Sequence, residues 1–196
     1  RSGNDPIMAA VQLAQALQTI VSRNRHPLEG AVLSITQIHA GSADNVIPTD
    51  AELRGTVRTF TAEMTDLVER RMREIAEHTC PAMNCEAVVR FDRNYPPTIN
   101  DAHEAAFCAE VMRDIVGDEN VDDHVMPTMG AEDFSYMLLE KPGCYVWIGN
   151  GDGEHREHGH GMGPCTLHNG SYDFNDALLP LGATYWVQLA LKRLAK

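Results

Sequence analysis

The sequence contains no excess of basic residues and no long hydrophobic run. Its 16 Lys and Arg against 28 Asp and Glu give a formal net charge of −12. Nucleic acids and anionic membrane surfaces bind basic patches, so this charge argues against both as partners. No stretch approaches the ~20 apolar residues of a membrane span, and the first residues lack the pattern of a signal peptide. We therefore expect no nucleic-acid partner and no membrane partner.

Cysteine is scarce and irregularly spaced. There are five cysteines, an odd number, and no C-x-x-C pair. A disulfide framework is therefore not expected, and a reduced, cytoplasmic location is favoured. The sequence has no initiator Met, and its first residues already have the pattern of a turn leading into a helix. We expect the chain to be part of something longer.

The first half of the chain alternates between helical and strand periodicity. The chain has 196 residues, 43% of them hydrophobic, which suffices for one large domain or two small ones. Apolar residues at helical spacing predict helices, and polar–apolar alternation predicts strands. The expected order is helix 4–24, strand 29–41, strand 51–60, helix 61–79 and strand 84–100. This order predicts an α+β layer, in which an antiparallel sheet carries two helices on one face.

The second half has a different pattern, which begins after the double proline Pro96-Pro97. We expect helices over 101–117 and 173–196, and a glycine-bearing turn with a short helix within 125–143. The almost entirely apolar run 144–151 predicts a strand buried on both faces, as in α/β sheets. The predicted domains are residues 1–95 and 96–196.

Four histidines lie within fourteen positions, at residues 155, 158, 160 and 168. His158 and His160 alternate with glycines, which is typical of an exposed, flexible loop rather than of a rigid ligand frame, and His155 belongs to the same loop. His168 lies just before the terminal helix, at the edge of the layer of the predicted buried strand, where α/β sheets place ligands. From the residues alone, His168 is either a metal ligand, a catalytic residue or a structural histidine.

Three motifs in fixed order carry a resemblance to a known family. These are GSADNVIPTDAELRGTVRTF at 41–60, MGAEDFSYM at 129–137 and LHNGSYDFND at 167–176. They are similar to motifs of the metal-dependent amidohydrolases that include hippurate hydrolase, indoleacetyl-amino-acid hydrolase and N-acyl-amino-acid deacetylases. The resemblance implies that residues 1–95 form most of a lid, or dimerisation, domain. Residues 96–196 would then form the C-terminal part of an α/β zinc-peptidase-like catalytic domain.

The resemblance also assigns roles to individual residues. His168 matches a ligand of one of two divalent metal ions (Zn, Mn, Co or Ni). Arg58 matches a residue that binds the substrate carboxylate, and Asn45 matches a lid residue that reaches the substrate across a dimer. Gly130 and Glu132 match a turn that lines the substrate pocket. Simpler interpretations exist: Asn45 suits a turn, Arg58 a surface ion pair, and Glu132 the first turn of a helix.

The catalytic part that precedes the lid in this family supplies most of the metal site and a general base from a paired Glu motif. This sequence contains neither a paired Glu nor a Cys-x-His. We therefore expect part of an N-acyl-amino-acid amidohydrolase that acts on a small-molecule substrate, forms a homodimer through the lid and is inactive by itself. The alternative is a non-catalytic dimerisation or binding module with a histidine-rich loop. A third interpretation makes His155, His158 and His160 a metal-storage or sensing site.

Overall fold

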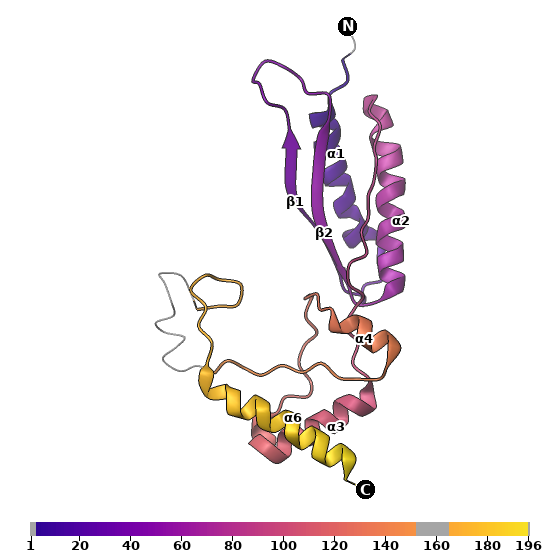
Figure 1. Ribbon diagram of the computed structural model, residues 1–196. Helices are drawn as coiled ribbons and strands as arrows, with labels where there is room; N and C mark the ends of the chain where they lie inside the picture. Colours follow the sequence, from indigo (N-terminus) through magenta and orange to yellow (C-terminus); the bar gives the residue numbers. More distant parts are fainter. Residues whose placement is uncertain (1–2, 152–164, 196) are drawn as a thin grey trace. The chain divides into compact units, whose positions relative to one another are not determined.

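The computed structural model describes residues 3–151 and 165–195 (Figure 1). The chain divides into two compact units. Unit 1 comprises Arg1–Thr98 and Pro127–Met137, and unit 2 comprises Ile99–Met126 and Leu138–Lys196. Among the described helices, none combines the length and the apolar character that crossing a membrane requires.

Unit 1 contains the four elements predicted for its first 80 residues. They are α1 (Pro6–Thr19), β1 (Ala31–Ala40), β2 (Ala51–Thr59) and α2 (Ala62–Thr79). Asp5 caps α1 by accepting hydrogen bonds from the backbone N–H groups of residues 7 and 8, at 3.0 and 3.2 Å. Thr61 caps α2 in the same way, from the N–H of Met64 at 3.1 Å. A π-helical turn, Ile20–Asn24, extends α1, and a 3-10 turn, Pro81–Met83, follows α2.

β1 and β2 form an antiparallel pair with one irregularity. The register shifts between Ile35 and Gln37, at a β-bulge, and Gly55 stands opposite Ile35. A Cβ atom at position 55 would lie 2.1 Å from the carbonyl oxygen of Ser34. Only glycine therefore fits the close backbone approach at this bulge.

The two helices and β1 share one hydrophobic core. Its buried members are Leu17, Ile20, Ala31, Leu33, Met64 and Val68. Val57 pairs with Leu33 and packs against this core, so the next residue, Arg58, lies on the opposite face of the sheet. A small antiparallel sheet with helices on one face is thus confirmed for unit 1 (Figure 1).

The predicted third strand over 84–100 is wrong. Residues 85–100 have no strand assignment, and the sheet of the described residues has two strands. Part of this segment is held to α2 by side chains instead. Arg73 donates to the carbonyl oxygen of Val89 at 2.8 Å, and Arg93 binds Glu69 and Asp66, each at 2.6 Å. The alternation of polar and apolar residues predicted an extended segment. It does not report whether a neighbouring strand is present to pair with that segment.

Unit 2 is built on two packed helices. They are α3 (Ala102–Val116) and α6 (Leu179–Leu194), and α6 follows a 3-10 turn, Asp176–Leu178. Pro180 is accommodated in the first turn of α6, where its missing N–H costs no hydrogen bond. A second 3-10 turn, Asp118–Asn120, follows α3. The short helix α4 (Phe134–Glu140) begins in the part of the chain assigned to unit 1 and lies where a short helix was predicted.

The predicted buried strand over 144–151 is also wrong. Residues 144–151 have no strand assignment, and the side chains of Trp147 and Ile148 are 62% and 49% exposed. Ile148 lies near α6, since its Cδ1 atom would be 3.6 Å from a Cβ atom at Gly182. Within the described part of the chain, no strand pairs with this run. The run therefore lacks the neighbours that would bury it.

Candidate metal and substrate site

His168 lies in a tight turn between the 144–151 run and α6. Its backbone is in the left-handed region, with φ 64°, which is uncommon for a residue other than glycine. The side chain is exposed, and it has no hydrogen-bond partner among the described residues. The left-handed backbone therefore presents the His168 side chain on the surface of the described chain.

Two asparagines anchor this turn, and the sequence analysis did not single them out. Asn175 donates its backbone N–H to Oδ1 of Asn150 at 3.0 Å, and its side chain donates to the carbonyl oxygen of Asn150 at 3.2 Å. Asn150 in turn donates to the carbonyl oxygen of Asp173 at 2.9 Å. The turn that carries His168 is therefore tied at its C-terminal side to the end of the 144–151 run. The only sequence signal was that each Asn lies at the end of a predicted element.

The other three histidines of the cluster, His155, His158 and His160, lie outside the described residues. The interpretation of these residues as solvated loop histidines, and the metal-storage hypothesis, stay predictions.

Arg58 lies on the open face of the sheet, opposite Val32. It is half-buried, and its guanidinium forms no hydrogen bond or ion pair within the described residues. Arg54, four residues earlier, is exposed and pairs with Glu52 at 3.0 Å. Arg54 therefore forms a surface ion pair, whereas Arg58, for which such a pair was the simpler interpretation, forms none with the described residues.

The turn that contains Gly130 and Glu132 belongs to unit 1. Met129 packs at Gly30, because a Cβ atom at Gly30 would lie 3.0 Å from the Met129 Cε atom. Gly30 precedes β1, so this turn lies at the end of the sheet that holds Arg58. The carbonyl oxygen of Glu132 accepts from the N–H of Ser135 at 3.3 Å, which makes Glu132 part of the entry into α4.

Asn45 lies at the other end of the sheet. It is exposed in the turn that joins Ala40 to Ala51, the last paired residues of the ladder. Ala40 lies eight positions along β1 from Val32, the partner of Arg58, which corresponds to roughly 26 Å along a strand. The structure therefore brings Arg58 and the Gly130 turn to one end of the sheet and leaves Asn45 at the other.

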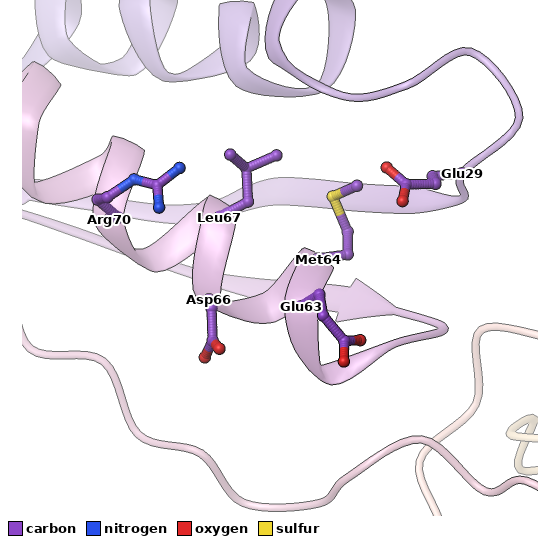
Figure 2. Close-up of a pocket in the computed structure, with 6 residues that line it drawn as sticks. All are labelled: Glu29, Glu63, Met64, Asp66, Leu67 and Arg70. Carbon is purple, nitrogen blue, oxygen red and sulfur yellow. The ribbon is translucent and has the colours of Figure 1, made fainter.

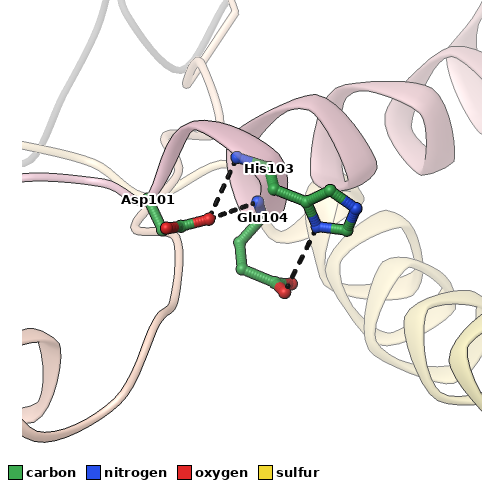
Figure 3. Close-up of side chains that lie close together, drawn as sticks. All are labelled: Asp101, His103 and Glu104. Atoms are coloured by element: carbon green, nitrogen blue, oxygen red, sulfur yellow. Dashed lines mark hydrogen bonds and ion pairs between the residues drawn. The ribbon is translucent and has the colours of Figure 1, made fainter.

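One cluster of possible metal ligands occurs in the described residues, and the sequence analysis did not name it (Figure 3). It consists of Asp101, His103 and Glu104. Asp101 already accepts hydrogen bonds from the N–H groups of His103 and Glu104, each at 3.0 Å, as the N-cap of α3. Glu104 also binds Arg193. Helix capping and an ion pair therefore account for this cluster.

Figure 2 shows a pocket of unit 1 whose lining contains none of the predicted site residues. It is shallow, has a volume of about 380 Å³ and is lined by residues Glu29, Glu63, Met64, Asp66, Leu67 and Arg70. Asp66 is already paired with Arg93. None of the predicted site residues lines this pocket, so it does not define the substrate site.

Comparison with known proteins decides the family. The sequence model of peptidase family M20/M25/M40 matches residues 13–192. The chain belongs to this family.

Curated M20-type relatives cover nearly the whole chain. N-acetyldiaminopimelate deacetylase of Enterococcus faecalis is 36% identical over 91% of this chain and 44% of its own length. Hippurate hydrolase of Campylobacter jejuni is 35% identical over 97% of this chain and 47% of its own length. The chain thus spans about half the length of the curated relatives it matches.

A solved structure extends the likeness to the fold. A dinuclear metal-binding peptidase of the M20 family from Bacillus subtilis superimposes with a TM-score of 0.72 and 30% identity. The match covers 97% of this chain and 46% of that protein. Both described units of this chain therefore correspond to parts of the M20 peptidase fold.

Proposed function

We propose that this chain supplies the lid and the C-terminal part of the catalytic domain of a metal-dependent amidohydrolase. The enzyme would cleave the amide bond of N-acyl amino acids, either hippurate-like or N-acetylated. Membership of the M20 family and the names of its relatives, hippurate hydrolase and N-acetyldiaminopimelate deacetylase, support this substrate class. Residues 1–95 are the proposed lid and residues 96–196 the proposed catalytic part. A reduced, cytoplasmic setting belongs to the same proposal, and the five free cysteines support it.

The observation that carries the proposal is the exposed His168 imidazole in its left-handed turn. Imidazole is a preferred ligand of Zn, Mn, Co and Ni ions, and His168 has a ring free to bind one. His168 would hold one of two divalent ions, whose other ligands lie outside the described residues. When bound, such ions polarise the amide carbonyl and lower the pKa of a bound water.

Arg58 would orient the substrate. Arg58 is half-buried as a residue and lies on the open face of the sheet, and its guanidinium is unpaired in the described chain, so it can bind the substrate carboxylate in a bidentate manner. Gly130 and Glu132 would line the pocket near the same end of the sheet, where the packing of Met129 at Gly30 holds their turn. Fixing the carboxylate positions the amide bond for attack.

Asn45 would act on the substrate of a second copy. The separation of roughly 26 Å along β1 is too long for Asn45 and Arg58 to touch one small substrate in the same chain. A homodimer formed through unit 1 removes this difficulty, because a two-fold axis can bring the Asn45 turn of one chain to the Arg58 end of the other. The proposal therefore includes a lid-mediated homodimer.

The chain alone would be inactive. A carboxylate general base is expected in the part of the family fold that this chain does not span. The uncovered run 144–151, with Trp147 and Ile148 exposed, supports the view that unit 2 lacks part of its sheet.

The test compares the chain alone with a chimera. In the chimera, the part of Campylobacter jejuni hippurate hydrolase that precedes its match to this chain is fused in front of residue 1. Both proteins are loaded with Zn²⁺ or Mn²⁺ and assayed on hippurate and N-acetyl amino acids. We expect hydrolysis by the chimera only. Hydrolysis by the isolated chain would contradict the proposed division of the site.

Two matched pairs of variants then test the roles. His168→Ala in the chimera should lower kcat by at least about 100-fold and remove bound metal, whereas His103→Ala should do neither. Arg58→Lys should raise KM by about tenfold or more, while Arg54→Lys leaves KM unchanged. Full activity of the His168→Ala chimera would remove His168 from the metal site.

The alternative function is a non-catalytic dimerisation or binding module. Its support is that unit 1 has its own core and two unpaired sheet edges within the described chain. Light scattering across a concentration series separates the outcomes. A dimer of the isolated chain together with an inactive chimera would favour the module, whereas a monomer at every concentration would contradict it.

A further inference from the structure

Residues 127–137 belong to unit 1, although the segments on both sides of them belong to unit 2. This 127–137 segment contains the turn of Gly130 and Glu132, which the proposed function places against the substrate. The same unit carries Arg58 on β2. The contacts that attach the 127–137 segment to unit 1 therefore decide how the turn lies relative to Arg58.

Met129 attaches the first part of this segment. A Cβ atom at Gly30 would lie 3.0 Å from the Cε atom of Met129 and 2.6 Å from the ring of Phe60, so both side chains occupy the space beside this glycine. Gly30 comes directly before β1, and Phe60 comes directly after β2, two positions beyond Arg58. The first attachment therefore lies at the end of the sheet that carries Arg58.

Tyr136 attaches the last part of the segment. Its hydroxyl donates a hydrogen bond to the carbonyl oxygen of Asn94, and its ring lies beside that of Tyr95, with centroids 6.1 Å apart and ring planes at 59°. The hydroxyl of Ser135, a residue that is 0% exposed, donates to the carbonyl oxygen of Glu132 at 2.6 Å. Because Ser135 precedes Tyr136 in the chain, these two hydrogen bonds connect Asn94 to the turn through adjacent residues.

The acceptor of the Tyr136 hydrogen bond is itself held in place. Arg93, the residue before Asn94, forms ion pairs with Asp66 and Glu69 of α2, each at 2.6 Å. The residue after Asn94 precedes a proline, which restricts its backbone to extended conformations. The carbonyl group of Asn94 is therefore restrained from both sides, and Tyr136 gains a fixed partner.

We propose that Tyr136 is a positioning residue for substrate binding, which holds the Gly130–Glu132 turn in a fixed place relative to Arg58. This inference rests on the proposed function, because it assumes that the turn and Arg58 contact the same N-acyl amino acid. Tyr136 acts through the turn and not on the reacting atoms. A displaced pocket wall weakens the binding of substrate and transition state alike, so KM should rise while kcat stays the same.

The first measurement is hydrogen exchange of the isolated chain, which requires no activity. The N–H groups of Ser135 and Tyr136 donate to carbonyl oxygens three residues earlier, at 3.3 and 3.0 Å. Tyr136→Phe removes the hydroxyl and keeps the ring, so these two amides should exchange about threefold to tenfold faster, while the amides of β1 and β2 do not change. Tyr95→Phe is the matched control, because the Tyr95 hydroxyl forms no hydrogen bond within residues 3–151 and 165–195.

The second measurement is the steady-state hydrolysis of hippurate by the chimera. Tyr136→Phe should raise KM about threefold to tenfold and change kcat by less than about twofold. A variant that only folded less well would lower the apparent kcat at an unchanged KM, because fewer molecules would be active. Arg93→Gln should also raise KM, since it releases the segment that carries the Asn94 carbonyl group. Arg90→Gln, at an exposed arginine without an ion pair in the described chain, should not.

The two measurements separate a failure of this inference from a failure of the proposed function. Unchanged exchange in Tyr136→Phe would overturn the inference, whether or not the chimera is active. An active chimera whose Tyr136→Phe variant keeps its KM, or loses kcat alone, would overturn it as well. An unsubstituted chimera that hydrolyses no N-acyl amino acid would contradict the proposed function, and the exchange measurement would then decide by itself whether Tyr136 holds the turn.

Discussion

The two units bury their hydrophobic residues very differently. In unit 1, two helices and a sheet enclose a common core that includes Ile20 and Val68, each 1% exposed. In unit 2, α3 and α6 pack together, but Trp186 of α6 is 71% exposed. Contiguous exposed apolar patches, unlike single exposed side chains, are typical of interfaces. Unit 1 thus encloses a core shared by two helices and a sheet, whereas the helix pair of unit 2 leaves the large apolar side chain of Trp186 exposed.

The largest expected effect is on the free energy of unfolding, when one large side chain is truncated to alanine in each unit. Ile20→Ala should lower the free energy of unfolding of unit 1 by about 3 kcal/mol, because it leaves a cavity in a closed core. Trp186→Ala should change the stability of unit 2 by less than about 0.5 kcal/mol, although it removes a larger side chain. Hydrogen exchange of the backbone amides, measured separately on β1–β2 and on α3–α6, reports the stability of each unit. Equal losses in both units would contradict the difference in their cores.

The bulge in unit 1 gives the next effect. Gly55→Ala should lower the stability of unit 1 by about 2 kcal/mol, because the added methyl group meets the Ser34 carbonyl oxygen and the backbone must shift. Thr56→Ala, at the adjacent exposed position, is the matched control and should have a much smaller effect. Urea unfolding followed by circular dichroism measures both. A neutral Gly55→Ala would mean that the strands can separate locally without cost.

The N-caps of α2 and α3 should contribute about equally to the stability of the two units. Thr61→Ala in α2 and Asp101→Ala in α3 should each cost about 1 kcal/mol, since each leaves backbone N–H groups of the first helical turn without their acceptor. Asp101→Asn should retain most of this stability. Thermal melts of Asp101→Ala with and without Mn²⁺ also test the cluster of Figure 3. A metal-dependent rise in the Tm of the unsubstituted chain that this variant loses would contradict the assignment of Asp101 as a cap alone.

The smallest effect is electrostatic and confined to unit 1. Hydrogen bonds from Arg73 and then Arg93 lower the pKa of Glu69 below its ordinary value of 4.5. A lowered folded-state pKa stabilises the fold above the unfolded pKa, and this contribution is lost as pH falls through the folded pKa. The Tm advantage over Glu69→Gln should therefore be present at pH 6 and disappear on acidification below 4.5. A Tm difference that is independent of pH would show that the charge of Glu69 does not stabilise the fold.

Local patterns in the sequence predicted most helices and both strands of unit 1. Asp5 and Thr61 supply cap acceptors, and the apolar spacing behind them selects one helix face, so α1 and α2 follow from short-range chemistry. The same is true of α3 and of α6 with its early proline. Three motifs in fixed order, the last of which contains His168, indicated the family.

The failures in the sequence prediction have a common cause. Residues 84–100 and 144–151 have strand-like composition, but a strand exists only where another backbone accepts its hydrogen bonds, and the alternation of side chains cannot report that. For the same reason, the sequence did not reveal the Asn150–Asn175 anchor, which joins residues that are 25 positions apart in the chain.

The helices, the hairpin, the family and the residue types of the candidate site could be predicted from the sequence, because they depend on local spacing and on motifs in fixed order. Which of those residues are available depends on the tertiary structure. It paired Arg54 and left Arg58 free, put Asn45 at the far end of the sheet from Arg58, and held His168 in a left-handed turn. The ion pair of Arg54 is local, with Glu52, but the position of Asn45 relative to Arg58 and the turn that holds His168 depend on contacts between distant segments. Such contacts have no fixed signature in one sequence.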